Sequence, residues 1–312
     1  MHFPIQPIDQ FGGPPLTKAD VQIFTAGTTS RWQTWAKPRG VAMSQMIAIG
    51  GGGGGAGGLT NGNVAGGGGG SSSVTRLLIP AFCLPDELYI QVGTGGQGGA
   101  VNGGNGSAGG ISYISLGHSV AAPNVIIASG TANAGGATGA TGGTAGSVEV
   151  ASAFSTWGLF ASVAGVAGTN GGTSAVGVSL TTPWTGTLSP LTPGTGGGGQ
   201  STTNPRTGGN ITIANGFDGS FGAILAAAGT FLPGGTSAGG NINNAGNPGF
   251  YSWQPFLCTG GTGGGNNING SGGQGGKGAP GCGGGGGATS SNTGTSGRGG
   301  AGGDGLVVII SW

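Results

Sequence analysis

Short stretches in which apolar and polar residues alternate recur along the chain, and this period of two is typical of β-strands. Residues 41–49 alternate in this way and run directly into a glycine tract at 50–58. Residues 88–92 lead into a second tract. At the end of the chain the order is reversed, because a tract at 297–305 precedes an apolar stretch at 306–312. We therefore expect strands that continue into glycine tracts.

The same pattern predicts further short strands between turns rich in glycine and proline. They lie at residues 21–24, 31–38, 74–81, 111–116, 124–128, 147–154, 176–180 and 210–214. The first two are predicted to form a β-meander with 41–49, with an apolar face that includes Ile23, Trp32, Met46 and Ile49. A helix of one or two turns is expected only at 221–228. The predicted fold class is all-β, with short antiparallel strands in a sandwich-like arrangement and almost no helix.

Within the tracts, glycine often recurs at every third position, as at Gly272, Gly275, Gly278, Gly281, Gly284 and Gly287. Three residues per turn is the period of the polyproline II helix, which makes no backbone hydrogen bonds of its own. Glycine also loses more conformational entropy on ordering than other residues. The tracts are therefore predicted to pack and bond with one another as a polyglycine II bundle, with residues 50–58 buried inside it.

The composition narrows the class of protein further. Glycine accounts for 84 of the 312 residues, 35% are hydrophobic and only 5% are charged. Collagen would require a strict Gly-X-Y period and about 15–20% proline, and the broken period and 16 prolines exclude it. Charge-driven disorder is also not expected, because the net charge is +1. The chain should be ordered and should belong to an assembly.

Long spans without any charged residue exclude several kinds of partner. No Asp, Glu, Lys or Arg occurs within 88–148, 150–205 or 219–276. Nucleic-acid binding needs several Lys or Arg side chains at phosphates, so this class of partner is not expected. The same scarcity of carboxylates argues against an acidic metal site. No window reaches the about 20 apolar residues of a membrane-spanning helix, so no membrane insertion is expected.

Candidate catalytic and cofactor-binding motifs are weak. Lys277 lacks the glycine that a Walker A loop requires at position 271, which is Ser271, and is followed by Gly278 instead of serine or threonine. His118 has no acidic residue near it in the sequence, and we interpret it as a turn residue. We predict no enzymatic activity, no cofactor and no metal.

The cysteines and the first residues bear on where the chain folds. Cys83, Cys258 and Cys282 are odd in number and cannot all pair within one chain, so reduced thiols in a reducing cytoplasm are expected. Residues 1–7 lack the basic and apolar regions of a Sec-type signal peptide. Residues 1–20 carry four prolines and are expected to be extended, either as an arm that binds a neighbouring protein or as a frayed tail.

The composition divides the chain into four parts: the arm at 1–20, a glycine-rich β module at 21–146, an insert of strands and loops at 147–258, and glycine tracts with the closing strand at 259–312. The insert carries aromatic residues that could form a core, a subunit interface or a surface that binds a ligand such as a glycan. The candidates are Trp157, Phe160, Trp184, Phe250, Tyr251, Trp253 and Phe256.

Several segments in order resemble a known family. The chain carries Phe24-Thr-x-Gly27, then Trp35-Ala-Lys37-Pro38-x-Gly40-Val41, a strand and a glycine tract. This order is similar to the opening of the glycine-rich domain found in tail fibre and other virion proteins of tailed bacteriophages. Residues 88–99, 109–112 and 299–310 resemble later parts of that domain. The resemblance covers roughly residues 21–116 and 294–312.

The resemblance implies a non-enzymatic structural component of a phage virion, such as a tail fibre or spike, assembled in the host cytoplasm. It also implies a homo-oligomer, often a homotrimer, in which polyglycine II bundles present loops to the host surface, and in which residues 1–20 could contact other virion proteins. One alternative is a receptor-binding adhesin tip that recognises a glycan or protein through loops of 147–258. Weaker alternatives are a capsid or collar decoration protein and a glycine-rich surface or ice-binding protein.

Overall fold

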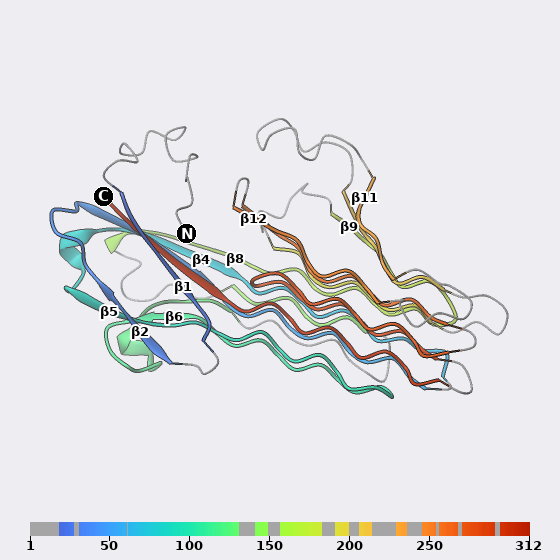
Figure 1. Cartoon of the computed structure of the whole chain (residues 1–312). Coiled ribbons are helices and arrows are strands. Elements are labelled where there is room, and N and C mark those ends of the chain that lie inside the picture. Colours follow the sequence, from blue (N-terminus) through green and yellow to red (C-terminus); the bar gives the residue numbers. More distant parts are fainter. Residues whose placement is uncertain are drawn as a thin grey trace.

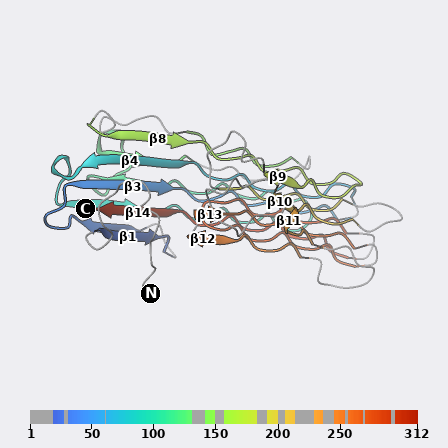
Figure 2. The same ribbon diagram turned by 90° about the horizontal axis from the view of Figure 1, so that it is seen from above.

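Two β-sheets pack face to face at one end of the molecule, and long glycine tracts extend from them to the other end (Figures 1 and 2). The computed structural model describes residues 19–27, 31–60, 62–130, 141–148, 157–182, 191–199, 206–213, 229–235, 245–253, 256–267, 270–290 and 294–312. Helical structure in these residues is confined to short 3-10 turns such as η3 (Ala81–Cys83) and η4 (Ala122–Asn124). The predicted all-β class is confirmed. The helix predicted at 221–228 and most of the strand predicted at 147–154 lie outside the described residues.

The larger sheet has the strand order β1-β14-β3-β4-β8. Its members are β1 (Asp20–Thr25), β3 (Met43–Ile49), β4 (Val74–Pro80), β8 (Leu159–Val163) and β14 (Leu306–Ser311). The closing strand β14 pairs antiparallel with both β1 and β3, so the prediction that the last residues return to the sheet of 41–49 is confirmed. The edge strand β8 comes from the segment 147–258, which therefore contributes to the same sheet.

The smaller sheet has the order β2-β5-β6-β7. Its members are β2 (Trp32–Ala36), β5 (Glu87–Gln91), β6 (Tyr113–Ser115) and β7 (Val125–Ala128). The predicted β-meander of 21–24, 31–38 and 41–49 is wrong, because β2 lies in the opposite sheet and β14 separates β1 from β3. Alternation along a strand identifies the strand, but it does not identify the partner when that partner lies far away in the sequence.

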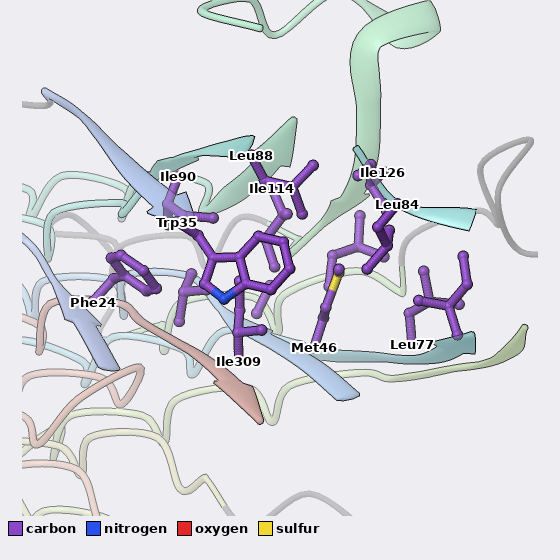
Figure 3. Packing of buried hydrophobic residues seen from close by; sticks show 14 of the residues in the cluster. Phe24, Trp35, Met46, Leu77, Leu84, Leu88, Ile90, Ile114, Ile126 and Ile309 are labelled. Atoms are coloured by element: carbon purple, nitrogen blue, oxygen red, sulfur yellow. The ribbon is translucent and has the colours of Figure 1, made fainter. Parts of the chain in front are cut away.

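Apolar side chains from both sheets form the core between them (Figure 3). Trp35 is fully buried there, together with Phe24, Met46, Ile90 and Ile309. The sandwich predicted from short antiparallel strands therefore has a single apolar interior between its sheets.

The apolar face predicted for the first three strands is correct for Met46 alone. Ile23 is 38% exposed, and Trp32 is half-buried on the opposite side of β2 from Trp35. Ile49 is buried, but it packs on the outer face of the larger sheet. The strands alternate as expected, and the error arose because the sequence does not say which of the two faces meets the second sheet.

The larger sheet is apolar on both faces. On the face away from the core, Ile49, Val74 and Leu306 pack in a second cluster with Leu191, Cys258, Ala279, Cys282, Val308 and Ile310. Every residue of β14 is buried. A strand covered on both faces needs no polar positions, which explains why β14 reads as a continuous apolar run rather than an alternation.

Strand hairpins continue into tract hairpins. Strand β3 leads into 50–58, and the chain returns as 65–72 to β4 after a turn whose described residues are 59–60 and 62–64. The connection 92–112 between β5 and β6 follows the same path, and the tract 294–305 leads directly into β14. Because neighbouring strands fix the direction of these tracts, their turns gather at the end far from the sheets (Figure 2).

Two small sheets lie beside the tracts, beyond the end of the larger sheet (Figures 1 and 2). One has the order β11-β10-β9, and the other pairs β12 with β13. Their bounds are β9 (Leu180–Thr182), β10 (Ile211–Ile213), β11 (Gly229–Leu232), β12 (Tyr251–Trp253) and β13 (Phe256–Cys258).

The tract at 281–289 shows how the glycine segments bond. Its N–H groups at 284, 285 and 286 donate to three different tracts, and those at 287, 288 and 289 repeat the same order of partners. Its carbonyls accept from three further tracts with the same period of three. The surrounding tracts are 50–58, 65–72, 191–199, 258–267, 271–279 and 294–305. Successive N–H groups thus point to three different neighbours, and the order of neighbours repeats every three residues. This is the hydrogen-bond arrangement of a polyglycine II bundle, in which each helix has three residues per turn.

Residues 50–58 follow the same rule and are all buried, as predicted. The N–H groups of Gly51, Gly54 and Gly57 donate to the carbonyls of one antiparallel tract, at Gly110, Ser107 and Gly104. The distances are 2.8, 2.9 and 2.8 Å. The backbone bonds that a lone polyproline II segment lacks are thus supplied by its neighbours.

Glycine is required in the tracts because the backbones lie so close together. A Cβ at Gly52 would overlap the carbonyl of Cys282, and one at Gly284 would overlap the carbonyl of Gly300. Positive φ is rare by comparison, and among the described glycines it occurs at Gly40, Gly103 and Gly281.

Buried serines line the boundary between sheets and tracts. Ser71, Ser72, Ser73, Ser112 and Ser129 are fully buried. The Ser112 hydroxyl donates to Ile49 O at 2.7 Å and accepts from Gly93 N–H at 3.0 Å. At this boundary the strand ladder ends before the bundle lattice begins, so side-chain hydroxyls satisfy backbone groups that neither pattern reaches.

Candidate binding surface

The aromatic residues predicted as candidates do not converge on one site. Trp157 lies just before β8 and is 61% exposed. Phe160, within β8, is half-buried and packs against the core between the sheets. Trp184 lies outside the described residues. On the edge of the larger sheet, one aromatic side chain therefore faces solvent and another packs inward.

A second group lies on the hairpin of β12 and β13. Trp253 pairs through the backbone with Phe256, and Tyr251 pairs with Cys258. Phe250 precedes the hairpin and is 39% exposed. Tyr251 packs against the second apolar cluster, and burial, with a smaller contribution from the charge of Cys258, raises the pKa of its phenol. Because it is half-buried against this cluster, Tyr251 belongs to the packing of the hairpin.

The far end of the bundle is a different candidate surface. Turns at 59–64, 101–103 and 173–175 connect tracts there (Figure 1). Val64 forms a bridge with Thr173, so two of these turns lie side by side. Asn102 and Ser174 have φ of 60° and 55°, and they are the non-glycine residues with positive φ in the described chain. Such backbone conformations are often found where side chains are positioned for function.

Polar side chains connect the chain segments at this end. Ser296 Oγ accepts from the N–H of Asn102 at 2.7 Å and from the Thr60 hydroxyl at 3.2 Å. Asn266 Nδ2 donates to Gly199 O at 3.2 Å and to Thr289 Oγ1 at 3.0 Å. No described residue of the turns 59–64, 101–103 and 173–175 is charged. The turns themselves therefore offer hydrogen bonds without charge, while Arg206, whose carbonyl accepts from Asn266 N–H, and the exposed Arg298 bring positive charge near this end.

The two sides of the bundle differ in charge. Exposed side chains recur at every third position on both sides, because a polyproline II helix has three residues per turn. One side presents Thr94, Gln97, Gln274, Lys277, Arg298 and Asp304. The opposite side, formed by 141–148 and 164–173, presents Thr141, Thr144, Ala164, Ala167 and Asn170.

One aromatic cluster was missed in the sequence. On the outer face of the smaller sheet, the His118 ring stacks on Trp32 at 5.9 Å between centroids and meets the edge of Tyr89 at 4.3 Å. Tyr89 lies on the opposite face of β5 from the buried Leu88 and Ile90, as alternation along 88–92 indicates. Alternation could not indicate that Trp32 and His118 join Tyr89, because the three residues come from separate parts of the chain.

Among the described residues, no three His, Cys, Asp or Glu side chains gather where they could hold a metal ion. The helical segments of the described chain are all too short or too polar to span a membrane.

A family model described as a glycine-rich domain matches residues 25–312. The match includes the tracts and every strand of both sheets except β1, of which it reaches only Thr25. It also extends over residues 117–293, which the resemblance noted in the sequence did not reach. The chain therefore belongs to this glycine-rich domain family. No curated protein matches the chain.

Proposed function

We propose that the protein is a non-enzymatic structural component of a bacteriophage virion, such as a tail fibre, spike or related appendage. The motifs at 24–27 and 35–41 support the link to phage virion proteins through their resemblance. The bundle supports a structural role, because consecutive backbone groups of 281–289 are bonded to surrounding tracts. Such a lattice resists bending without a conventional side-chain core, which suits a rigid projecting element.

In this proposal the sheets anchor the bundle and the turns at its far end contact the host surface. The observation that carries this assignment is the gathering of 59–64, 101–103 and 173–175 at that end, away from the sheets. Their described residues are neutral, so a partner that offers hydrogen bonds, such as a cell-surface glycan or a polar protein surface, fits better than a highly charged one.

A receptor-binding adhesin tip that acts through the segment 147–258 is the second candidate. Ser174 belongs to this segment and lies in one of the end turns with positive φ. The exposure of Trp157 and Phe250 also favours contact by this segment. The two candidates differ in which residues contact the host, the end turns of three tract hairpins in the first and the segment 147–258 in the second.

The first experiment asks whether the chain is a virion part. Particles purified from a lysate of the cells that encode the chain are digested and analysed by mass spectrometry. We expect the chain in stoichiometric amounts with other virion proteins, and its absence from intact particles would refute the phage assignment. Sedimentation equilibrium of the purified chain tests the proposed homotrimer, which should have three times the chain mass of 29.1 kDa.

The second experiment tests the end of the bundle. The double variant Asn102→Gly, Ser174→Gly removes two end side chains, while glycine tolerates the positive φ at both positions. Cell adsorption of labelled protein is expected to fall at least about tenfold, which corresponds to about 1.4 kcal/mol of binding free energy. Gln97→Ala, Gln274→Ala is the matched control on the side of the bundle and should bind normally. Equal loss in both variants would contradict recognition by the end.

A further inference from the structure

Two of the three cysteines lie side by side in the second apolar cluster. Cys258 ends β13, and Cys282 follows Gly281 at the start of the tract 281–289. Both are free thiols with no exposed surface, and their side chains form a hydrogen bond. Cys83 is separate, because it is half-buried in η3 and packs against the core between the sheets.

The backbone holds this pair in register. Next to Cys258, the carbonyl of Thr259 accepts from Ala279 N–H at 3.0 Å, and the carbonyl of Ala279 accepts from Cys282 N–H at 2.9 Å. Further along the same two segments, Gly261 N–H donates to Gly283 O at 3.0 Å. The two segments are thus already adjacent, which is the condition that a disulfide places on its backbone.

We propose that Cys258 and Cys282 form a redox clasp, a dithiol in reducing surroundings and a disulfide in oxidising ones. Hydrogen peroxide is the oxidant. It converts one thiol to a sulfenic acid and releases one water, and the second thiol then attacks that sulfur and displaces a second water. Two electrons pass from the sulfurs to the peroxide, and both thiol protons leave in water.

The clasp fixes the hairpin of β12 and β13 to the tract 281–289, which lies among six other tracts. Burial, followed by the hydrogen bond with Cys258, raises the pKa of the Cys282 thiol. The thiolate is the reactive form, so oxidation of the folded protein is slow at neutral pH. In the proposed setting of a virion part, the reducing cytoplasm keeps the dithiol intact during folding, and the slow oxidation of the folded protein still allows the disulfide to form during longer exposure outside the cell.

Trypsin separates the three cysteines and provides a direct test. Cleavage after lysine and arginine places Cys83 in 77–206, Cys258 in 207–277 and Cys282 in 278–298. Native protein is treated overnight with hydrogen peroxide and digested without reduction. Mass spectrometry should then find peptide 207–277 joined to 278–298, while peptide 77–206, which contains Cys83, stays unlinked. The melting temperature should rise by at least about 4 °C and return to its starting value with dithiothreitol.

The variant Cys83→Ala is the matched control and should retain the link and the rise in melting temperature, whereas Cys282→Ala should lose both. The proposal is overturned if Cys258 and Cys282 remain unlinked, if Cys83 takes part in the disulfide, or if the link leaves the melting temperature unchanged. If Cys282→Ala fails to fold, the peptide map of the peroxide-treated protein without substitutions still shows whether Cys258 and Cys282 are linked.

Discussion

At a tract glycine, the smallest added side chain is expected to have a large effect. A methyl group at Gly284 would overlap Gly300 O and would also crowd the carbonyl of Ala301. Both atoms belong to the backbone and cannot rotate away, so Gly284→Ala should lower the free energy of unfolding by at least about 2 kcal/mol. Chemical denaturation followed by circular dichroism measures this loss.

Gly117 provides the control for this substitution, because nothing lies within 4 Å of a Cβ built there. Gly117→Ala is expected to change the free energy of unfolding by no more than about 0.5 kcal/mol. Similar losses at Gly117 and Gly284 would mean that the backbones are not held as closely as the lattice requires.

Replacing a buried and an exposed tryptophan by alanine compares how much each side chain contributes to the free energy of unfolding. Trp35 is fully buried, and its indole N–H has no hydrogen-bond partner, so its contribution comes from packing. Trp35→Ala should cost about 3–5 kcal/mol of unfolding free energy. Trp157 is 61% exposed, and Trp157→Ala should cost no more than about 0.5 kcal/mol. Comparable losses in urea titrations would place Trp157 in the packing rather than on a surface available to a partner.

At the scale of elements, the transition from strand to tract depends on buried hydroxyls. Ser112→Ala would leave Ile49 O and Gly93 N–H without the partner that now serves both. An unsatisfied buried polar group costs about 1–3 kcal/mol, so this variant should be destabilised within that range. Ser107→Ala is the control, because its hydroxyl accepts from Gln97 N–H at an exposed position where water can replace it. If thermal melts of the two variants coincide, the boundary does not depend on Ser112.

Many individual strands could be predicted from the sequence, because alternation and β-branched residues act locally. The strand predicted at 176–180 is wrong except at Leu180, where β9 begins, and β11, β12 and β13 were not predicted. Strands β4, β5, β6, β7 and β10 lie where the pattern placed them. The pairing of β1 with β14 joins segments from opposite ends of the chain. No local pattern in the first strand indicates this partner. The continuous apolar run of β14 was the available signal, since a strand buried on both faces belongs in the interior of a sheet.

The candidate site was less predictable than the fold. The aromatic residues of 147–258 suggested one surface, but the described members divide between exposed Trp157 and Phe250 and the packed Phe160 and Tyr251. Where apolar side chains are scarce, the same residue types must also serve as packing, and composition does not distinguish the two roles. The end of the bundle was not predicted residue by residue, because its turns come together only through the packing of the tracts.

At the scale of the whole molecule, sheets and bundle should unfold together. The tracts 50–58, 65–72 and 294–305 are direct continuations of β3, β4 and β14, so the bundle cannot separate while these strands remain paired. Circular dichroism follows the tracts. Tryptophan fluorescence follows the smaller sheet in a background variant in which Trp157, Trp184, Trp253 and Trp312 are replaced by phenylalanine, so that Trp32 and Trp35 are the remaining tryptophans.

The two signals should give one coincident transition in guanidinium chloride, as expected for a cooperative unit. Gly284→Ala, which alters the bundle only, should then lower the fluorescence midpoint as much as the dichroism midpoint. A dichroism transition that precedes an unchanged fluorescence transition would instead make the bundle a separate folding unit supported by an independently stable sandwich. Coincidence is the expected result because the second apolar cluster joins Ile49, Val74 and Leu306 of the sheet to Leu191 and Cys282 of the bundle.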